Sequence, residues 1–195
     1  MNFPVTLSFK LLALANQIYI RDAGGNLLGY VKQKMFKLKE DINIFADEQQ
    51  TQMLFNIKAD RMIDWSANYS FTDNRGNFLG SIKRQGMRSI WKASYDIFDS
   101  SGNQVYKIGE ENGWVKVADA LFGELPLVGI LSGYVFNPSY VVSRMDGTPI
   151  AHLKKEPAMF EGKFVLSNQG QLSTEEETRV LLGVLMMTLL ERRRG

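Results

Sequence analysis

The chain has 195 residues, enough for one domain that buries about 70% of its unfolded surface. Its 23 basic and 21 acidic residues leave a net charge of +2, which is too small for bulk attraction to nucleic acid, so an anion-binding site would have to be a local patch. Cysteine is absent, which excludes disulfides, thiolate metal sites and cysteine nucleophiles and fits a reducing compartment.

The N-terminal segment lacks the order of a secretory signal. Its basic residue, Lys10, follows the stretch Phe3 to Phe9 instead of preceding the apolar run, and that run, Leu11 to Ala15, is short. A signal peptide needs an apolar region of about 7 to 15 residues. We therefore predict a cytoplasmic protein with a single domain over residues 1–195.

A turn motif recurs along the chain. Asp-x-x-Gly-Asn occurs at Asp22–Asn26, Asp73–Asn77 and Asp99–Asn103, and a fourth copy keeps Asp146-Gly147. Aspartate at the first position of a type I turn, followed by glycine in the left-handed conformation, is typical of a β-hairpin with a bulge. A fifth segment, from Ile44, keeps the flanking pattern without the glycine.

Counted in chain order and including the segment from Ile44, the first four turns recur about every 25 residues, a period that holds two strands. They are either repeats of one hairpin or unrelated hairpins that share popular turn residues. A repeat of two-stranded units would pair edge to edge and remove its free edges by closing into a barrel.

The second strands share a further pattern that bears on the inside of such a barrel. Gly29, Gly80 and Ala151 each lie two residues before a branched residue, on the same face of the strand, and small wall residues let something bulky approach. The neighbouring apolar Leu28 and Leu79 leave open which face is inside.

Basic residues occupy the same place in three hairpins, just after the second strand. They are Lys32, Lys34, Lys83, Arg84, Lys154 and Lys155. At one rim of a barrel they would form a site for anionic lipid headgroups or phosphate. The alternative is that they keep strand edges soluble.

The segment Asp119–Phe136 is apolar but interrupted by Gly123, Pro126 and Gly129, a pattern that breaks both helix and strand. It is either a buried connection between barrel halves or a loop that meets a membrane or a protein partner.

No catalytic or metal-binding pattern stands out. His152 is the only histidine, expected on a solvated wall, and nothing resembles a nucleophile elbow. The run Glu175 to Glu177 lacks the spaced oxygen ligands of a calcium loop, and Gly24-Gly25 lies in a hairpin turn instead of a phosphate loop. We expect no enzyme, no metal and no cofactor.

A helix is predicted at the C-terminal end, from about Glu175 to Arg192. Thr174 and Glu177 fit a capping box, carboxylates occupy the first turn and arginines follow the last one. Between them, apolar residues cover every side of the helix, and Gly183 is expected to mark a close contact with a wall.

The length of this apolar part decides where it is buried. Val180 to Leu190 spans about 16 Å as a helix, whereas a bilayer core is about 30 Å thick. A tail anchor would place charged residues in hydrocarbon at both ends. A β-barrel wrapped around the helix buries all its sides, so we predict a mainly β fold with a central helix.

These features resemble a known family. Hairpins with "GNLLGYVKQK", "GNFLGSIKRQ" and "GTPIAHLKKEPAMF", followed by "KFVL" and an apolar terminal helix, are similar to the tubby C-terminal superfamily, in its LURP-one-related and phospholipid-scramblase-like branch. The resemblance implies a closed antiparallel barrel of about twelve strands around the helix. It also implies a membrane role, with anionic phospholipids or phosphoinositide-like headgroups as ligands.

Two functions follow from this resemblance. One is a non-enzymatic module that binds anionic lipids peripherally at a membrane, through the six basic residues. The other is a soluble protein-interaction or stress-response scaffold without a lipid ligand. The missing cysteines distinguish the chain from scramblase-like members, which weakens the case for lipid translocation.

Overall fold

The computed structural model describes residues 1–12, 15–34, 41–60, 67–85, 94–111, 138–156 and 161–192. The strands in chain order are β1 (Val5–Leu12), β2 (Ala15–Arg21), β3 (Leu27–Lys34), β4 (Asp41–Phe45), β5 (Met53–Ala59), β6 (Asn68–Asp73), β7 (Phe78–Arg84), β8 (Ser94–Phe98), β9 (Gln104–Glu110), β10 (Ser139–Arg144), β11 (Pro149–Glu156) and β12 (Glu161–Asn168), and the helix α3 (Thr174–Arg192) follows them. The apolar segment Asp119–Phe136 lies outside the described residues.

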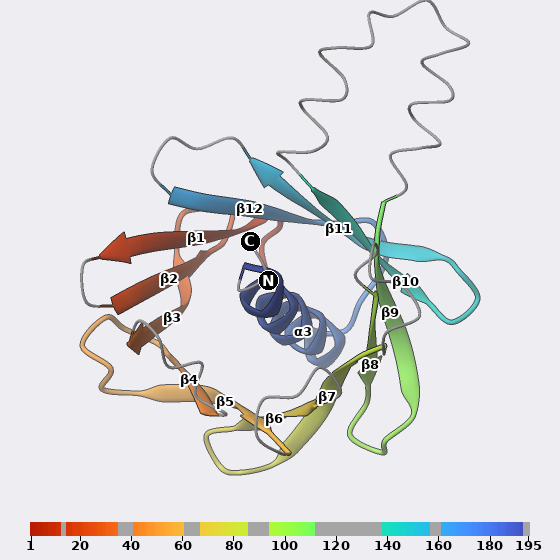
Figure 1. Ribbon diagram of the computed structural model, residues 1–195, viewed down its shortest axis with the longest axis horizontal. Helices are drawn as coiled ribbons and strands as arrows, with labels where there is room; N and C mark the ends of the chain where they lie inside the picture. The colour runs from red at the N-terminus through yellow and green to blue at the C-terminus, as the bar shows by residue number, and fades with distance from the viewer. Residues whose placement is uncertain are drawn as a thin grey trace, which may run out of the picture.

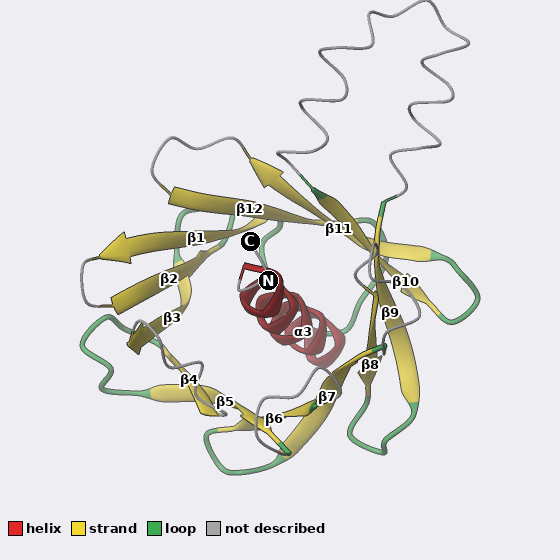
Figure 2. Ribbon diagram, viewed as in Figure 1, coloured by secondary structure: helices red, strands yellow, loops and turns green. Residues whose placement is uncertain are grey.

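The strands form a closed antiparallel barrel in chain order. Each strand pairs with its neighbours in sequence, and β1 pairs with β12 to close the ring. Helix α3 lies inside the ring, as the view along the barrel shows (Figure 1) and the colouring by secondary structure makes plain (Figure 2). The predicted barrel of about twelve strands around a C-terminal helix is confirmed.

The repeated turns are built as their sequence predicts. In the first one, Asp22 Oδ1 accepts a hydrogen bond from the amide of Asn26 at 2.9 Å, and Gly25 has a φ of 82°. The turns that begin at Asp73 and Asp99 repeat the amide contact. Hydrogen bonds from the turn asparagines lower the pKa of all three carboxylates. The hairpin prediction is therefore confirmed.

The helix begins one residue earlier than predicted, and a different residue caps it. Ser173 Oγ accepts the amide of Glu176 at 3.3 Å, and the Glu176 carboxylate accepts the amide of Ser173 at 2.8 Å. The predicted capping box of Thr174 with Glu177 is wrong by one position. Both pairs have the right spacing, and the chain enters the helix at Ser173.

The apolar sides of α3 are buried on all faces, from Val180 to Leu189. The helix does not lie on the barrel axis: its backbone approaches β7, β8 and β6 most closely. Gly183 permits this approach, because a Cβ there would lie 2.6 Å from Cδ1 of Ile97 in β8. The predicted close contact at Gly183 is confirmed.

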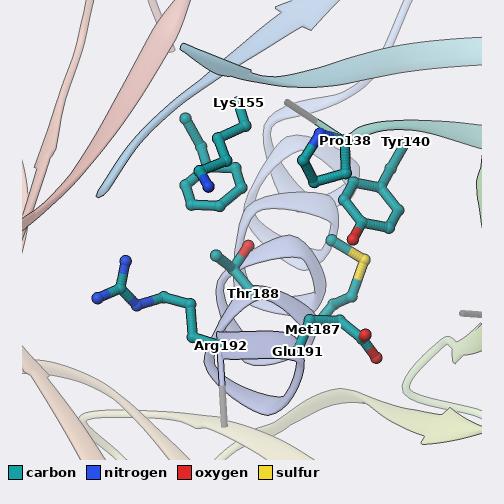
Figure 3. A pocket seen from close by; sticks show the side chains of 8 residues that line it. Pro138, Tyr140, Lys155, Met187, Thr188, Glu191 and Arg192 are labelled. Atoms are coloured by element: carbon teal, nitrogen blue, oxygen red, sulfur yellow. The ribbon is translucent and has the colours of Figure 1, made fainter. Parts of the chain in front are cut away.

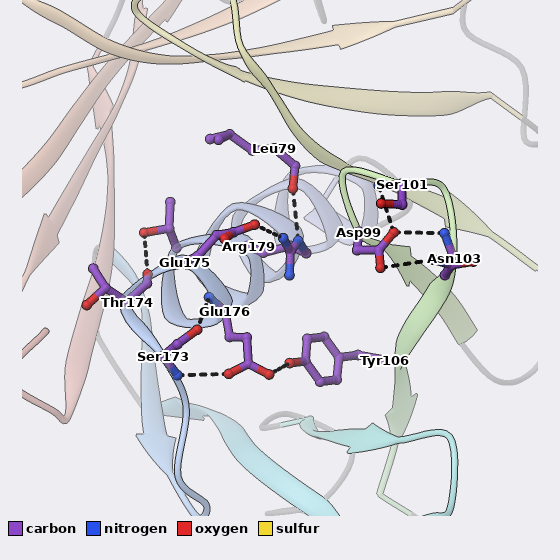
Figure 4. Close-up of polar contacts among 11 residues, drawn as sticks. Leu79, Asp99, Ser101, Asn103, Tyr106, Ser173, Thr174, Glu175, Glu176 and Arg179 are labelled. Carbon is purple, nitrogen blue, oxygen red and sulfur yellow. Dashed lines mark hydrogen bonds and ion pairs between the residues drawn. The ribbon is translucent and has the colours of Figure 1, made fainter.

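A second glycine, Gly80 in β7, lets a buried arginine of the helix reach the wall. Arg179 is 5% exposed, donates from Nε to the carbonyl oxygen of Leu79 at 2.9 Å and forms an ion pair with Glu175. Figure 4 shows these contacts. A Cβ on Gly80 would lie 3.1 Å from Arg179 Nε and 2.3 Å from the carbonyl oxygen of Phe98, and its φ is 139°.

A hydroxyl from β9 fixes the first turn of the helix. Tyr106 donates to Glu176 at 2.5 Å, and Arg144 lies 3.5 Å from the same carboxylate. The hydrogen bond from Tyr106 is the main cause that lowers the pKa of Glu176 to about 2. Burial, followed by this bond, raises the pKa of Tyr106 to about 12. The helix start is thus tied to the wall by polar contacts (Figure 4).

Two glycines of the wall provide a matched test of the close approach. We expect Gly80→Ala to lower the free energy of unfolding by about 2–4 kcal/mol, because the new methyl would meet a backbone carbonyl at a positive φ. Gly109→Ala in β9 should change it by less than about 0.5 kcal/mol, since no atom lies within 4 Å of its Cβ position. Urea unfolding of both variants measures this. Equal stabilities would contradict the packing described.

Glu176 should contribute to stability in a pH-dependent way. Its folded pKa of about 2 lies below the ordinary value of 4.5, so the unfolded chain holds the proton more tightly. The stabilisation is complete above about pH 5 and is lost as the pH falls toward about 2. We expect Glu176→Gln to flatten the pH dependence of the unfolding free energy in this window, measured by urea unfolding. Tyr106→Phe should also flatten this pH dependence, because it removes the hydrogen bond to Glu176. An unchanged pH dependence in both variants would contradict the role assigned to Glu176.

Candidate functional site

The two ends of the barrel are formed by different parts of the chain. Strands β3, β7 and β11 run in the same direction and end at one opening, where the last turn of α3 also lies, because α3 runs back from the end of β12. We call this end the C-terminal mouth, defined by the ends of these strands and by Arg192. The repeated turns and the polar contacts of the helix start lie at the other end, the N-terminal mouth.

The six predicted basic residues all belong to strands that end at the C-terminal mouth. The structure does not bring them side by side, because β3, β7 and β11 are four strands apart in the ring. At about 4.8 Å per strand, that is about 19 Å along the wall between one pair and the next. The side chain of Lys34 lies outside the described residues. Basic groups therefore surround the mouth at three positions.

Strand alternation divides the pairs further. Lys32, Lys83 and Lys154 each follow a buried residue and are exposed on the outer wall. The next residue along turns inward: Arg84 lies 6.0 Å from the ring of the buried Tyr95, and Lys155 lines a cavity. The adjacent residues of the pairs Lys83–Arg84 and Lys154–Lys155 thus lie on opposite sides of the barrel wall.

The cavity, of about 330 Å³, lies between the end of α3 and strands β10 to β12. It is lined by Pro138, Tyr140, Lys155, Phe164, Met187, Thr188, Glu191 and Arg192 (Figure 3). The helix backbone lies closest to β6, β7 and β8, and the cavity lies on the opposite side of the helix. Met187, Thr188 and Phe164 are buried, whereas Arg192 is exposed, so the cavity leads from the surface to a buried floor.

The charged groups of the cavity have fixed neighbours. The Arg192 guanidinium lies 4.6 Å from the ring of Phe9, and Glu191 accepts a hydrogen bond from Tyr95 at 2.5 Å. Thr188 donates to the carbonyl of Val184 at 2.7 Å, which leaves its oxygen able to accept a further bond. Sequence reasoning identified Lys155 but missed Tyr140, Thr188 and Glu191.

His152 takes part in a polar cluster on the outer wall. Ser139 Oγ donates to Glu111 Oε2 at 2.6 Å, and His152 Nε2 lies 3.3 Å from the same oxygen. A catalytic triad needs the histidine between the hydroxyl and the carboxylate. Here the carboxylate lies between them, so the cluster does not activate the serine.

Neither a metal site nor a membrane-spanning helix is found in the described part of the chain. Its histidine, aspartate and glutamate residues form no group of three or more placed to hold a metal ion. Among the described ranges, no helix is both long and apolar enough to cross a bilayer.

Comparisons with known proteins agree with this architecture. The family model described as LURP-one-related matches residues 27–95. A solved X-ray structure of an Arabidopsis thaliana protein has a TM-score of 0.51 and 15% sequence identity, and the match covers 97% of this chain and 92% of that chain. No curated protein sequence matches significantly.

At 15% identity the Arabidopsis structure shows a common fold and no more. The family match covers β3 to the start of β8, which includes the second strand of the first hairpin and all of the hairpin at Asn68–Arg84. The predicted resemblance to LURP-one-related proteins is thus confirmed for residues 27–95, and the Arabidopsis structure confirms the fold of the whole chain.

Proposed function

We propose that this protein is a non-catalytic module that binds anionic lipid headgroups at the cytoplasmic surface of a membrane, through the C-terminal mouth. The observation that carries the proposal is the position of Lys32, Lys83 and Lys154, which are exposed and lie near the ends of strands that all open at this mouth. A flat anionic surface facing the mouth would meet all three lysines together.

The spacing of the lysines suits a surface better than a single small anion. A cation near an anionic membrane contributes about 1 kcal/mol, so three would contribute about 3 kcal/mol, or about a hundredfold in affinity. Lys83 lies opposite Asp96 in the neighbouring strand, which reduces its share. Lys154 lies opposite Ser139 and Val165, and Lys32 opposite Gln17, so these two are the stronger candidates.

The alternative is a soluble interaction or stress-response scaffold, in which the lysines only keep the wall soluble. The ion pair of Lys163 with Glu156, at 2.7 Å on the neighbouring strands, favours it locally, because it shows acidic and basic residues alternating on the wall. Vesicle binding separates the two functions.

Charge reversals at the two mouths test the lipid proposal. In co-sedimentation with vesicles of phosphatidylcholine and phosphatidylserine, we expect Lys32→Glu and Lys154→Glu each to weaken binding by about tenfold, because each replaces an attraction with a repulsion. Arg75→Glu makes the same change of charge in an exposed turn at the N-terminal mouth and should bind like the wild type. Binding should weaken as salt is raised.

The opposite results have clear meanings. Equal loss in all three variants would show that net charge, and not the C-terminal mouth, governs binding. No binding at low salt would favour the scaffold. Replacing phosphatidylserine with a phosphoinositide at equal vesicle charge shows whether one headgroup is preferred.

A further inference from the structure

We propose that the cavity at the C-terminal mouth is a binding site for a small zwitterion, a molecule that carries a phosphate or carboxylate and an ammonium group a few bonds apart. The cavity lies inside the barrel and uses a different set of residues from the outer lysines. The inference therefore stands independently of the proposed membrane binding.

The distribution of charge inside the cavity is the first argument. Figure 3 shows the nitrogens of Lys155 and Arg192 on one side of Thr188, and the carboxylate of Glu191 and the hydroxyl of Tyr140 on the other. One side can donate to an anionic oxygen, and the other can accept from an ammonium group. A ligand with both groups can contact both sides at once.

The net charge of the cavity argues against a highly charged anion. Two cations and one carboxylate give a net charge of +1. The last turn of α3 adds about half a negative charge from its free carbonyls. A multiply phosphorylated headgroup would meet Glu191 and this helix end without enough positive charge to balance it. A neutral zwitterion, or one with a single excess negative charge, fits better.

The shape of the cavity limits the size of the ligand. Its volume of about 330 Å³ is near the lower end for small-molecule sites, about 300–1,000 Å³. The floor is formed by the rings and thioether of Phe164, Tyr140 and Met187, of which Met187 is fully buried. This floor suits a short methylene chain between the two charged ends. The oxygen of Thr188 lies between them and can accept a hydrogen bond.

Helix position makes the site possible. Gly183 and Gly80 let α3 approach β7 and β8 closely. Gly162 in β12 leaves room for the Arg192 side chain beside the cavity, since a Cβ there would lie 2.0 Å from Arg192 Nη1. The Tyr95 hydroxyl holds Glu191, and the ring of Phe9 lies under Arg192, which reduces the freedom these long side chains would lose on binding.

Titration calorimetry at low salt with phosphoethanolamine as the probe tests the site directly. Inorganic phosphate and ethanolamine each present one half of the zwitterion. We expect phosphoethanolamine to bind at least about tenfold more tightly than either, because each alone can contact only one side of the cavity. Inorganic phosphate that binds as tightly as phosphoethanolamine would overturn the proposal, and so would the absence of heat from all three.

Variants assign the two sides of the site. Lys155→Met should weaken phosphoethanolamine binding by about tenfold or more, and Glu191→Gln should do the same while keeping a carbonyl for the Tyr95 hydroxyl. Lys163→Met, on the outward-facing residue next to Phe164, is the matched control and should bind like the wild type. Thermal unfolding confirms that each variant is folded. Unchanged binding in both cavity variants would overturn the assignment.

The same chemistry exists free in solution and in lipid headgroups. Neutral phosphatidylcholine vesicles with and without phosphatidylethanolamine distinguish the two sources. Binding to the vesicles that contain phosphatidylethanolamine would identify a headgroup if Lys155→Met abolishes it. Binding of free phosphoethanolamine without vesicle binding would identify a soluble ligand. Because these vesicles lack net charge, their result is separate from that of the outer lysines.

Discussion

The enclosure of a helix that is apolar on every side is the constraint on which the rest of the structure depends. Barrels of about eight strands fill their interior with their own side chains, and much wider ones enclose water. A ring of twelve strands lies between these limits, and a helix about 10 Å across occupies the space that its side chains leave. The helix in turn finds apolar contacts on all sides. Neither part has a complete core without the other, so the wall pattern and the terminal helix depend on each other.

The enclosed helix also makes the ends of the barrel unequal. At its start, Arg179 and Glu176 are bound by a wall carbonyl and by the Tyr106 hydroxyl, so polar contacts hold that end in place. The approach of Gly183 to Ile97 draws the helix toward one side of the ring. Space then remains on the other side, and near the last turn it becomes the cavity beside Phe164. An off-centre helix thus gives one tied end and one end with room for a ligand.

Local chemistry explains which of these features the sequence predicts. The hairpin turns follow from Asp and Gly at fixed spacing, and the burial of the helix follows from its composition and length. The cap is ambiguous, because Ser173 with Glu176 and Thr174 with Glu177 fit the same motif, and only the path of the chain selects the first. Lys154 and Lys155 lie on opposite faces of β11, and alternation along the strand predicts this once Leu153 is known to face inward. The cavity is different: it combines strands β10 to β12 with the helix end, which lie far apart in the sequence, and no local pattern brings them together.

Alternation has a consequence for how such a barrel would select what it binds. An outward lysine acts through solvent and over a distance set by screening, so it contributes attraction with little discrimination. Its inward neighbour is partly desolvated beside a buried floor, where an unmatched polar group is costly and a matched one is favoured. Lys154 and Lys155 are adjacent in sequence yet meet these two different conditions. On β11, Lys154 can therefore attract anions in general at the outer wall, while Lys155 can select among ligands at the inner wall.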